Sequence, residues 1–324
     1  MTNSTRAGPI AVIGAGTMGA GIAQIFAQTG HSVRLQARKR ETLEAALRRI
    51  RVNQDELIRH GLLRTEDADA ARRRITVTQN LNEALAGAAF VSENIPERLD
   101  VKQSLFAELS RLTLPETILS TNTSSLSITQ VARDTKYPER VVGFHWFNPP
   151  HLIPLVEVIR GERTSDAAMD ATYHLAQAIG KSPIRVQKDI PGFVGNRLQR
   201  ALEREFFYLE RIGACSGADL EVALKQGLGF RWSVVGPLEH ADLAGVDTHA
   251  ATVALLFPLL SNDTTPPPLF AELSAQGRLG AKTGGGVYEY GPGDVERILA
   301  RRNTMLIDFI KVLKKHPSLR DPYA

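Results

Sequence analysis

The stretch Ile10-Ala-Val-Ile-Gly14-Ala-Gly16-Thr17-Met18-Gly19 decides the fold. Four apolar residues predict a buried β-strand that runs directly into a Gly-x-Gly-x-x-Gly turn, and residues 20–27 have the apolar spacing of a helix. Gly14 would allow the tight turn, Gly16 would let a pyrophosphate approach the backbone, and Gly19 would let helix and strand pack closely. Because a helix N-terminus directs N–H groups at phosphates, this strand, turn and helix predict a dinucleotide-binding site.

Short apolar runs alternate with amphipathic segments through the first half of the chain. This is the βαβ rhythm of a parallel sheet with helices on both faces. The predicted strands are residues 10–13, 33–36, 90–93, 118–120, 141–144 and 155–158. Around residue 188 the strand signals stop, and Phe193, Leu198, Leu202, Phe206 and Leu209 mark one face of a helix. We therefore predict an α/β chain: a Rossmann-type, doubly wound sheet over residues 1–188, then an all-α C-terminal domain over residues 189–324.

Composition limits the class of protein. The 324 residues are 43% hydrophobic and carry a formal net charge of +4, which suits anionic ligands but falls short of a nucleic-acid-binding signature. The single cysteine excludes an internal disulfide, and neither a secretory signal nor a membrane-spanning stretch is evident. We expect a cytoplasmic protein that binds neither nucleic acid nor membranes, and no metal site.

The end of the second predicted strand bears on the choice of dinucleotide. An acidic residue there would bind the ribose 2′-hydroxyl of NAD, but this chain has Ala37. Arg38, Lys39 and Arg40 follow, and a small residue beside cations suits a 2′-phosphate. This pattern favours NADP and leaves NAD possible, because the three cations could instead be a solvated helix start.

A histidine and a carboxylate occupy two neighbouring predicted strands. His145 lies at the end of one strand and Glu157 within the next, so the two can meet across the sheet. A histidine that titrates near neutrality can take a hydroxyl proton while hydride leaves the same carbon, and a carboxylate can orient its ring. Taken alone, the pair could equally be a hydrogen-bonded core histidine and an ion pair.

The motifs together resemble the L-3-hydroxyacyl-CoA dehydrogenase family over nearly the whole chain. They are Gly14-Ala-Gly-Thr-Met-Gly-Ala-Gly-Ile-Ala-Gln, Ser120-Thr-Asn-Thr-Ser-Ser-Leu, His145-Trp-Phe-Asn-Pro, Asp189-Ile-Pro-Gly-Phe-Val-Gly-Asn-Arg and Gly280-Ala-Lys-Thr-Gly-Gly-Gly-Val-Tyr. The resemblance implies that His145 is the general base, Glu157 its partner, and Ser124 and Asn196 the active-site hydroxyl and amide. It also implies cofactor contacts at Glu97, Lys102, Asn122, Asn148 and Lys282. His151 lies in a proline-rich turn outside the histidine motif and is a weaker candidate for the base.

Three departures from the family leave the choice of dinucleotide and the substrate open. Ala37 replaces the acid, Pro154 stands where the CoA-dependent members usually have a lysine, and residues 227–233 resemble the L-gulonate and carnitine dehydrogenase branches. A short-chain 3-hydroxyacyl-CoA would need cationic partners for its phosphates. The candidates are Arg48, Arg49, Arg51, Arg59 and Arg64. A free 3-hydroxy acid would need a carboxylate clamp, for which Arg231 is a candidate.

Two alternative functions remain open, and the sequence also bears on the oligomeric state. The chain could be a carbonyl or imine reductase on the same fold, or a non-catalytic dinucleotide-binding module, although the His145 and Glu157 constellation argues against the module. Several apolar helix faces in the C-terminal domain have little chain against which to pack. We therefore expect a homodimer formed through that domain.

Overall fold

The computed structural model describes residues 8–316 and divides the chain into two compact units. The first unit ends at Asn196 and also includes the segment Leu306–Lys311. The second unit comprises Arg197–Met305 and the chain from Val312 onward. The first unit is built around a β-sheet, and the second unit is helical.

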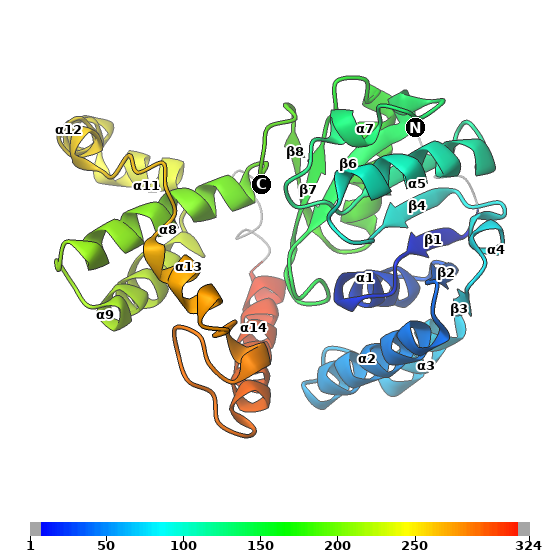
Figure 1. The fold of residues 1–324 in the computed structure, drawn as a ribbon, viewed down its shortest axis with the longest axis horizontal. Coiled ribbons are helices and arrows are strands. Elements are labelled where there is room, and N and C mark those ends of the chain that lie inside the picture. Colours follow the sequence, from blue (N-terminus) through cyan, green and yellow to red (C-terminus); the bar gives the residue numbers. More distant parts are fainter. Residues whose placement is uncertain (1–7, 317–324) are drawn as a thin grey trace. The chain divides into compact units, whose positions relative to one another are not determined.

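An eight-stranded sheet forms the centre of the first unit, in the order β3-β2-β1-β4-β5-β6-β7-β8 (Figure 1). Neighbouring strands are parallel except β6 and β7. The strands are β1 (Ile10–Ile13), β2 (Val33–Gln36), β3 (Ile75–Thr78), β4 (Phe90–Glu93), β5 (Ile118–Thr121), β6 (Val141–Trp146), β7 (Leu155–Ile159) and β8 (Ser182–Val186). The strand order reverses between β1 and β4, and ligands of doubly wound sheets bind at the carboxyl ends beside such a reversal.

The sequence predicted six of these strands and missed β3 and β8. Both missed strands are sheet edges, where one neighbour is lacking and the residues are only half-buried. β3 alternates Ile and Val with Thr, and β8 contains Pro183, which is tolerated at an edge. Neither strand has the continuous apolar run that is typical of a central parallel strand.

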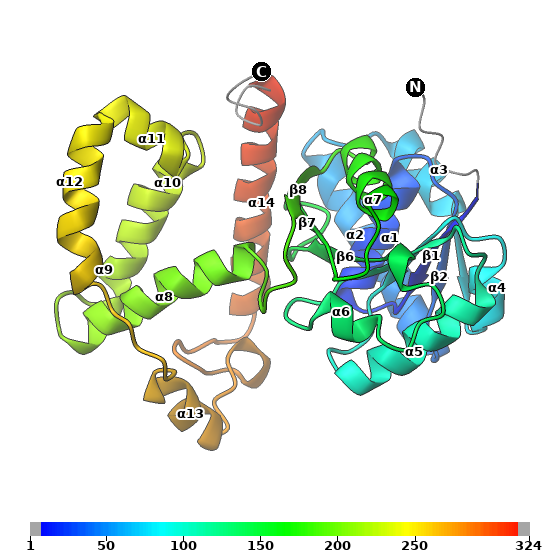
Figure 2. The same cartoon turned by 90° about the horizontal axis from the view of Figure 1, so that it is seen from above.

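Helices cover both faces of the sheet (Figures 1 and 2). One face packs against α1 (Thr17–Gln28), α2 (Arg40–Arg59), α3 (Thr65–Arg73) and α7 (Asp166–Ala178), the other against α4 (Leu81–Leu85), α5 (Leu99–Leu112) and α6 (Ile128–Val131). Alternation along β1 shows the division, because Val12 faces the first layer and Ile13 the second. The α/β, doubly wound prediction is confirmed.

A third, smaller cluster belongs to the last helix, α14 (Asp294–Lys315). Ile307 is completely buried and packs in the first unit with Leu57, at the end of α2, and with Leu152, in the turn before β7. No feature of the sequence at Ile307 predicted this contact, since helical periodicity identifies an apolar face but not its partner.

The second unit is helical. Its helices are α8 (Gly195–Arg211, from Arg197), α9 (Gly217–Val222), the π-helix η2 (Ala223–Leu228), α10 (Gly229–Trp232), α11 (Pro237–Ala244), α12 (Val246–Leu256) and α13 (Pro268–Ala275), together with parts of α14. Short 3-10 turns flank them at η3 (Phe257–Leu259) and η4 (Ala281–Thr283), and η1 (Pro138–Arg140) precedes β6 in the first unit. Figure 2 shows these helices following one another along the chain, with no β-sheet among the described residues of this unit. Among its described residues only two hydrophobic side chains, Leu220 and Leu313, are buried.

The predicted face of α8 requires a correction. Phe193 is not on the helix: it precedes α8, is fully buried, and has a φ of 52°, which is unusual for a residue with a side chain. Leu198 is on the helix but is 66% exposed. The sequence predicts a domain boundary after residue 188, and the compact units divide after Asn196.

Candidate active site

The glycine turn between β1 and α1 has the shape that a dinucleotide needs. Gly14 has a φ of 98°, and a Cβ placed on Gly19 would lie 1.8 Å from the Gly14 carbonyl oxygen, so neither position accepts a side chain. A Cβ on Gly16 would meet nothing within 4 Å. Gly16 is the N-cap of α1 and supplies no side-chain cap, and the next residues, Thr17 and Met18, are not buried. The turn therefore presents open space at an uncapped helix N-terminus, where a pyrophosphate fits.

The end of β2 carries no acidic residue. Ala37 is buried, and its amide donates to the Thr78 carbonyl oxygen at 3.3 Å. Arg38 and Lys39 are exposed, and among the described residues no carboxylate contacts either one, while Arg40 pairs with Glu44 at 3.0 Å. This edge of the sheet thus has free positive charge where the ribose of a dinucleotide would lie.

His145 and Glu157 are directly opposite one another in the antiparallel pair β6 and β7. The His145 Nδ1 and Glu157 Oε2 atoms are 2.6 Å apart, and both side chains are buried. No side chain among residues 8–316 forms a hydrogen bond with Nε2, the other ring nitrogen. The rings of Phe147 and Phe193 lie 4.6 and 5.7 Å from the imidazole, centroid to centroid. One nitrogen is therefore fixed by a carboxylate, and the other is available to a substrate.

Glu157 also holds the start of α8. Its second oxygen, Oε1, accepts hydrogen bonds from the amides of Val194 and Gly195 at 3.0 and 2.9 Å. Burial alone would raise the pKa of Glu157, but the hydrogen bonds from His145 and from these two amides hold that pKa below its usual value. The residue is consequently an ionised carboxylate that joins the imidazole to the segment around Phe193.

Ser124 and Asn196 form a second hydrogen-bonded pair, and Asn196 directly follows Gly195, whose amide donates to Glu157. The Asn196 Nδ2 atom donates to the Ser124 carbonyl oxygen at 2.9 Å. Glu97 holds the other side of the Ser124 turn, because its Oε1 accepts the Ser124 amide at 2.9 Å and the Thr123 hydroxyl at 2.6 Å. Although burial opposes ionisation, these bonds keep the pKa of Glu97 below its usual value. The structure therefore brings together all four predicted catalytic residues.

Lys102 is part of a buried charge network that the sequence did not indicate. Its Nζ atom is 2.7 Å from Glu93 Oε1 and 3.5 Å from Glu97 Oε2, and the side chain is only 1% exposed. Glu93 also accepts the Thr121 hydroxyl at 2.6 Å. The position of Glu93 at the carboxyl end of β4 was a signal that could have identified it. Lys102 contacts Glu97, and through it supports the Ser124 turn.

The remaining predicted contacts are scattered. Asn122 accepts the Trp146 amide at 2.8 Å and donates to Asn94, so it ties β6 to the loop after β4. Asn148 is exposed directly after β6. Lys282 is exposed in η4, which belongs to the second unit. His151 lies in the turn before β7, outside the pairing of β6 and β7 that sets His145 opposite Glu157.

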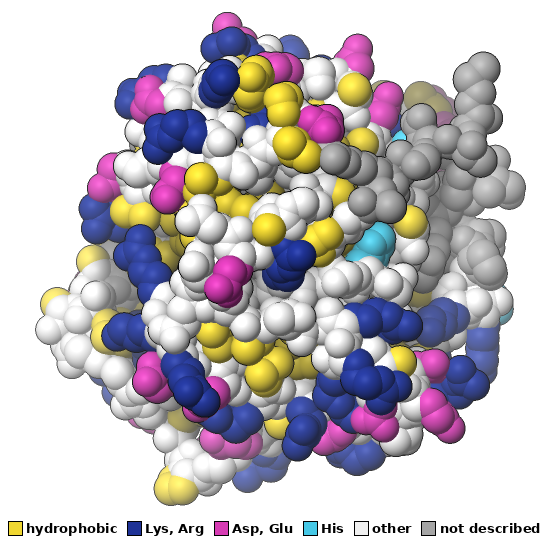
Figure 3. All heavy atoms as spheres, turned by 90° about the vertical axis from the view of Figure 1, so that its right-hand side faces the viewer, with side chains coloured by type: hydrophobic (Ala, Val, Ile, Leu, Met, Phe, Trp, Pro, Cys, Tyr) yellow, Lys and Arg dark blue, Asp and Glu magenta, His cyan; other side chains and the backbone are white. Residues whose placement is uncertain are grey.

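The face of the molecule drawn in Figure 3 carries charges of both signs. On the face drawn in Figure 3, Lys and Arg side chains gather in the lower part with Asp and Glu among them. No helix among residues 8–316 is both long enough and apolar enough to cross a bilayer, and the same residues contain no cluster of potential metal ligands.

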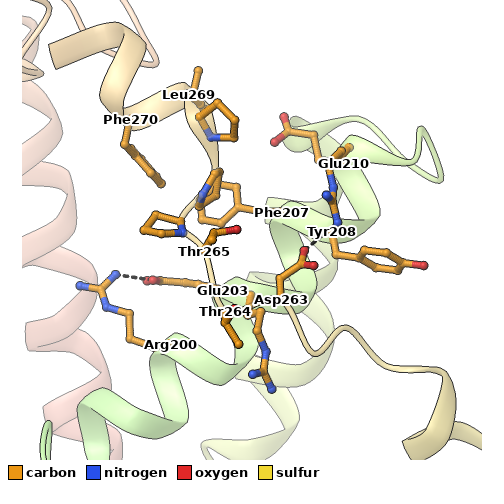
Figure 4. Close-up of a pocket in the computed structure, with 15 residues that line it drawn as sticks. Arg200, Glu203, Phe207, Tyr208, Glu210, Asp263, Thr264, Thr265, Leu269 and Phe270 are labelled. Atoms are coloured by element: carbon orange, nitrogen blue, oxygen red, sulfur yellow. Dashed lines mark hydrogen bonds and ion pairs between the residues drawn. The ribbon is translucent and has the colours of Figure 1, made fainter. Parts of the chain in front are cut away.

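A cavity of about 680 Å³ lies in the second unit, between α8 and the proline-rich loop before α13 (Figure 4). Two arginines on its walls are already paired, Arg200 with Glu203 and Arg211 with Asp263. Phe207 contributes an aromatic wall. None of the predicted site residues lines this cavity.

The fold and site define a class: a nicotinamide-dependent dehydrogenase with a Rossmann-type domain. Family models match most of the chain, the 3-hydroxyacyl-CoA dehydrogenase NAD-binding domain over residues 9–190 and the C-terminal domain of the same family over residues 192–290. The chain belongs to the 3-hydroxyacyl-CoA dehydrogenase family and is an oxidoreductase of that family. The resemblance drawn from the sequence motifs is confirmed.

Individual relatives differ in the compounds that they are named for. The chain is 33% identical to 5-formyl-3-hydroxy-2-methylpyridine 4-carboxylate 5-dehydrogenase of Mesorhizobium japonicum, covering 94% of this chain and 98% of the relative. It is 36% identical to 3-hydroxybutyryl-CoA dehydrogenase of Clostridioides difficile, covering 87% and 99%. A crystal structure of a 5-formyl-3-hydroxy-2-methylpyridine 4-carboxylic acid 5-dehydrogenase, described as an NAD⁺-dependent dismutase, superimposes with a TM-score of 0.88 at 33% identity over 94% of this chain and 98% of that one.

Proposed function

We propose that the chain interconverts a secondary alcohol and its ketone on a 3-hydroxyacyl skeleton, R–CH(OH)–R′ + NAD(P)⁺ → R–CO–R′ + NAD(P)H + H⁺. The observation that carries this proposal is the buried contact of 2.6 Å between His145 Nδ1 and Glu157 Oε2. His145 lies near the carboxyl end of β6, and Gly14 follows the carboxyl end of β1. The two therefore share the edge of the sheet at which ligands of this fold bind.

His145 would act as the general base. With Nδ1 directed at Glu157, its Nε2 can accept the proton of the substrate hydroxyl. A nicotinamide dinucleotide held by the glycine turn would supply the acceptor for the hydride from the carbon that bears this hydroxyl. The ionised Glu157 stabilises the imidazolium that forms and prevents the ring from turning. The flanking rings of Phe147 and Phe193 exclude water from one side of the imidazole.

Ser124 and Asn196 would hold the reacting oxygen. A hydroxyl and an amide directed at an oxygen stabilise the charge that develops there during hydride transfer. The Glu97 carboxylate and the hydrogen bond from Asn196 fix the backbone around Ser124. These two residues would orient the substrate, and the proton would pass to His145.

We propose NADP as the preferred cofactor, with NAD as the alternative. Ala37 removes the carboxylate that would repel a 2′-phosphate, and Arg38 and Lys39 are free to bind that phosphate. Steady-state kinetics with both cofactors test this choice. A higher kcat/KM with NADPH than with NADH is expected, and the reverse would contradict the proposal.

A short-chain 3-hydroxyacyl-CoA is the first substrate candidate, because the family model matches both units. A free carboxylic acid is the second candidate. It is favoured by the similarity over 94% of the chain to a dehydrogenase named for a free pyridine carboxylate. Steady-state assays with acetoacetyl-CoA and with free 3-hydroxy acids separate the two, since absence of thioester turnover would eliminate the first.

We propose further that the second unit forms a homodimer. Leu238, Leu243 and Leu255 are 81%, 74% and 68% exposed, and a unit this size with two buried hydrophobic side chains has no core of its own. A second copy offers the same apolar faces, and a twofold interface buries both sets at once.

A further inference from the structure

A buried lysine, Lys181, lies beside the proposed site, and it has no role in the proposed reaction. Lys181 comes between α7 and β8, and it is 8% exposed. Its Nζ atom donates to the carbonyl oxygens of Pro150 and Ile153 at 2.6 and 2.7 Å. No carboxylate among residues 8–316 contacts it. An ammonium group placed in the interior with only carbonyl acceptors is costly, so a role for it is expected.

Both acceptors belong to the turn of residues 147–154, which connects β6 to β7. The turn rests on α1: a Cβ built on Gly21 would lie 2.5 Å from Pro150 Cγ. The N-terminus of α1 forms the glycine turn. Lys181 therefore binds the turn in its middle, at Pro150, and near its end, at Ile153, and Pro150 itself packs against the helix that would bind the pyrophosphate.

The same turn continues from the strand that carries the proposed base. Trp146 follows His145, and Lys181 Nζ lies 5.1 Å from the Trp146 ring centroid. The next residue, Phe147, places its ring 4.6 Å from the His145 imidazole. Movement of the turn would therefore shift a ring that contacts His145 and would also shift Asn148.

We propose that Lys181 is a positioning residue, a buried ammonium that fixes the turn of residues 147–154 against α1 and so keeps Phe147 and Asn148 in place beside His145. The proposal rests on the proposed function of His145. It differs from a packing role because the bond is made by a titratable group. Methionine fills a similar volume but offers no donor to either carbonyl oxygen.

Burial lowers the pKa of Lys181 to about 7. The ammonium, and with it the strongest form of both hydrogen bonds, is then lost as the pH rises through neutrality. The titratable and charged groups on the neighbouring elements are His145 on β6, Glu157 on β7, Arg185 on β8, His151 in the turn, and Asp166, Asp170, Tyr173 and His174 on α7. Asp170 pairs with Arg185 at 2.7 Å, and α1 carries no titratable side chain.

Tryptophan fluorescence tests the proposal without any turnover. The chain has two tryptophans, so W232F leaves Trp146 as the only reporter. In this background we expect the Trp146 emission to change between pH 6 and 8 with a midpoint near the pKa of about 7. The step should disappear in K181M and in K181Q, and it should persist in K136M, which removes an exposed lysine that lies over another aromatic ring, Tyr137.

Kinetics complete the test in the wild-type background. Because a small misplacement near reacting atoms is costly, we expect K181M to lower kcat by roughly tenfold to a hundredfold with a smaller change in cofactor KM. K181Q, which keeps two N–H donors, should recover part of kcat. A fluorescence step that persists in K181M, or K181M kinetics equal to those of wild type, would overturn the proposal. If no variant or wild type turns over any substrate while the step behaves as expected, the proposed function fails and the placement of Lys181 stands.

Discussion

The two units of the chain bury their apolar side chains to very different extents. In the first unit, two layers of helices cover an eight-stranded sheet, and its strands β1, β4 and β6 are buried along their whole length. In the second unit, α8, α11 and α12 contain no buried residue. The first unit has a core of its own, and the proposed homodimer would give the exposed apolar faces of the second unit a surface to pack against.

The predicted catalytic residues lie in the first unit, and the exposed apolar faces proposed for dimer contact lie in the second. The four predicted catalytic residues lie in the first unit as two hydrogen-bonded pairs, His145 with Glu157 and Asn196 with Ser124, and the Gly195 amide, next to Asn196, also donates to Glu157. The second unit contributes exposed leucines and phenylalanines instead. Substitutions in the first unit should therefore change turnover with assembly intact, and substitutions on the apolar faces of the second unit should change assembly.

The largest effect is expected for His145→Gln. Loss of a general base commonly lowers the rate by 10²–10⁴-fold, so kcat should fall by about 10³-fold. Binding of NADPH, followed by its fluorescence, should be unchanged because His145 does not contribute to the glycine turn. Retained turnover would remove His145 from the mechanism, and loss of the folded state by circular dichroism would return it to a core role.

Glu157→Gln should have the next largest effect. Loss of the carboxylate that orients a histidine costs on the order of 10–100-fold in activity, and we expect kcat to fall by about that factor. The substitution also replaces the carboxylate that accepts the Val194 and Gly195 amides with a neutral amide. The midpoint temperature of unfolding should therefore be measured beside kcat. A kcat within twofold of wild type would contradict an orienting role.

Comparing Glu157→Gln with wild type also tests a predicted pH dependence of the free energy of unfolding. The pKa of Glu157 is lower in the folded chain than its ordinary value of 4.5, so its ionisation stabilises the fold above about pH 4.5. That stabilisation is lost as the pH falls through the lower, folded pKa. The difference in unfolding free energy between wild type and E157Q, from urea titrations between pH 3 and 7, should therefore shrink at the acid end. A constant difference would contradict the ionised state.

A smaller effect is expected for Ala37→Asp. A carboxylate at the end of β2 would repel a 2′-phosphate and could accept a ribose hydroxyl, so the ratio of kcat/KM for NADPH over NADH should fall by at least about tenfold. Glu44→Gln serves as the control, because it removes a nearby carboxylate on α2 that pairs with Arg40. An unchanged ratio in A37D would show that the ribose does not lie there.

The smallest change in activity is expected for Leu255→Asp. A charge on this exposed position of α12 should weaken the proposed dimer, so the mass from light scattering should fall toward that of one chain at low concentration. Leu112→Asp is the matched control, since Leu112 is an exposed leucine of the first unit, at 41%. Equal masses for L255D and wild type would place the interface elsewhere.

Local patterns in the sequence predicted much of the first unit and less of the site. The central strands and the meeting of His145 with Glu157 follow from apolar runs and from strand adjacency. The edges β3 and β8 lack such runs, so they were missed. Lys102 and Lys181 could not be recognised as buried, because each binds a different element from its own: Lys102 binds Glu93 at the end of β4, and Lys181 binds the turn of residues 147–154.

A crystal structure with NADP⁺ and a 3-hydroxyacyl substrate bound tests the central claim most directly. We predict that His145 Nε2 lies within about 2.6–3.2 Å of the substrate hydroxyl oxygen, with Nδ1 still on Glu157 and the nicotinamide against the same carbon. A ring nitrogen turned away from that oxygen, or a His145 and Glu157 pair separated in the complex, would contradict the account.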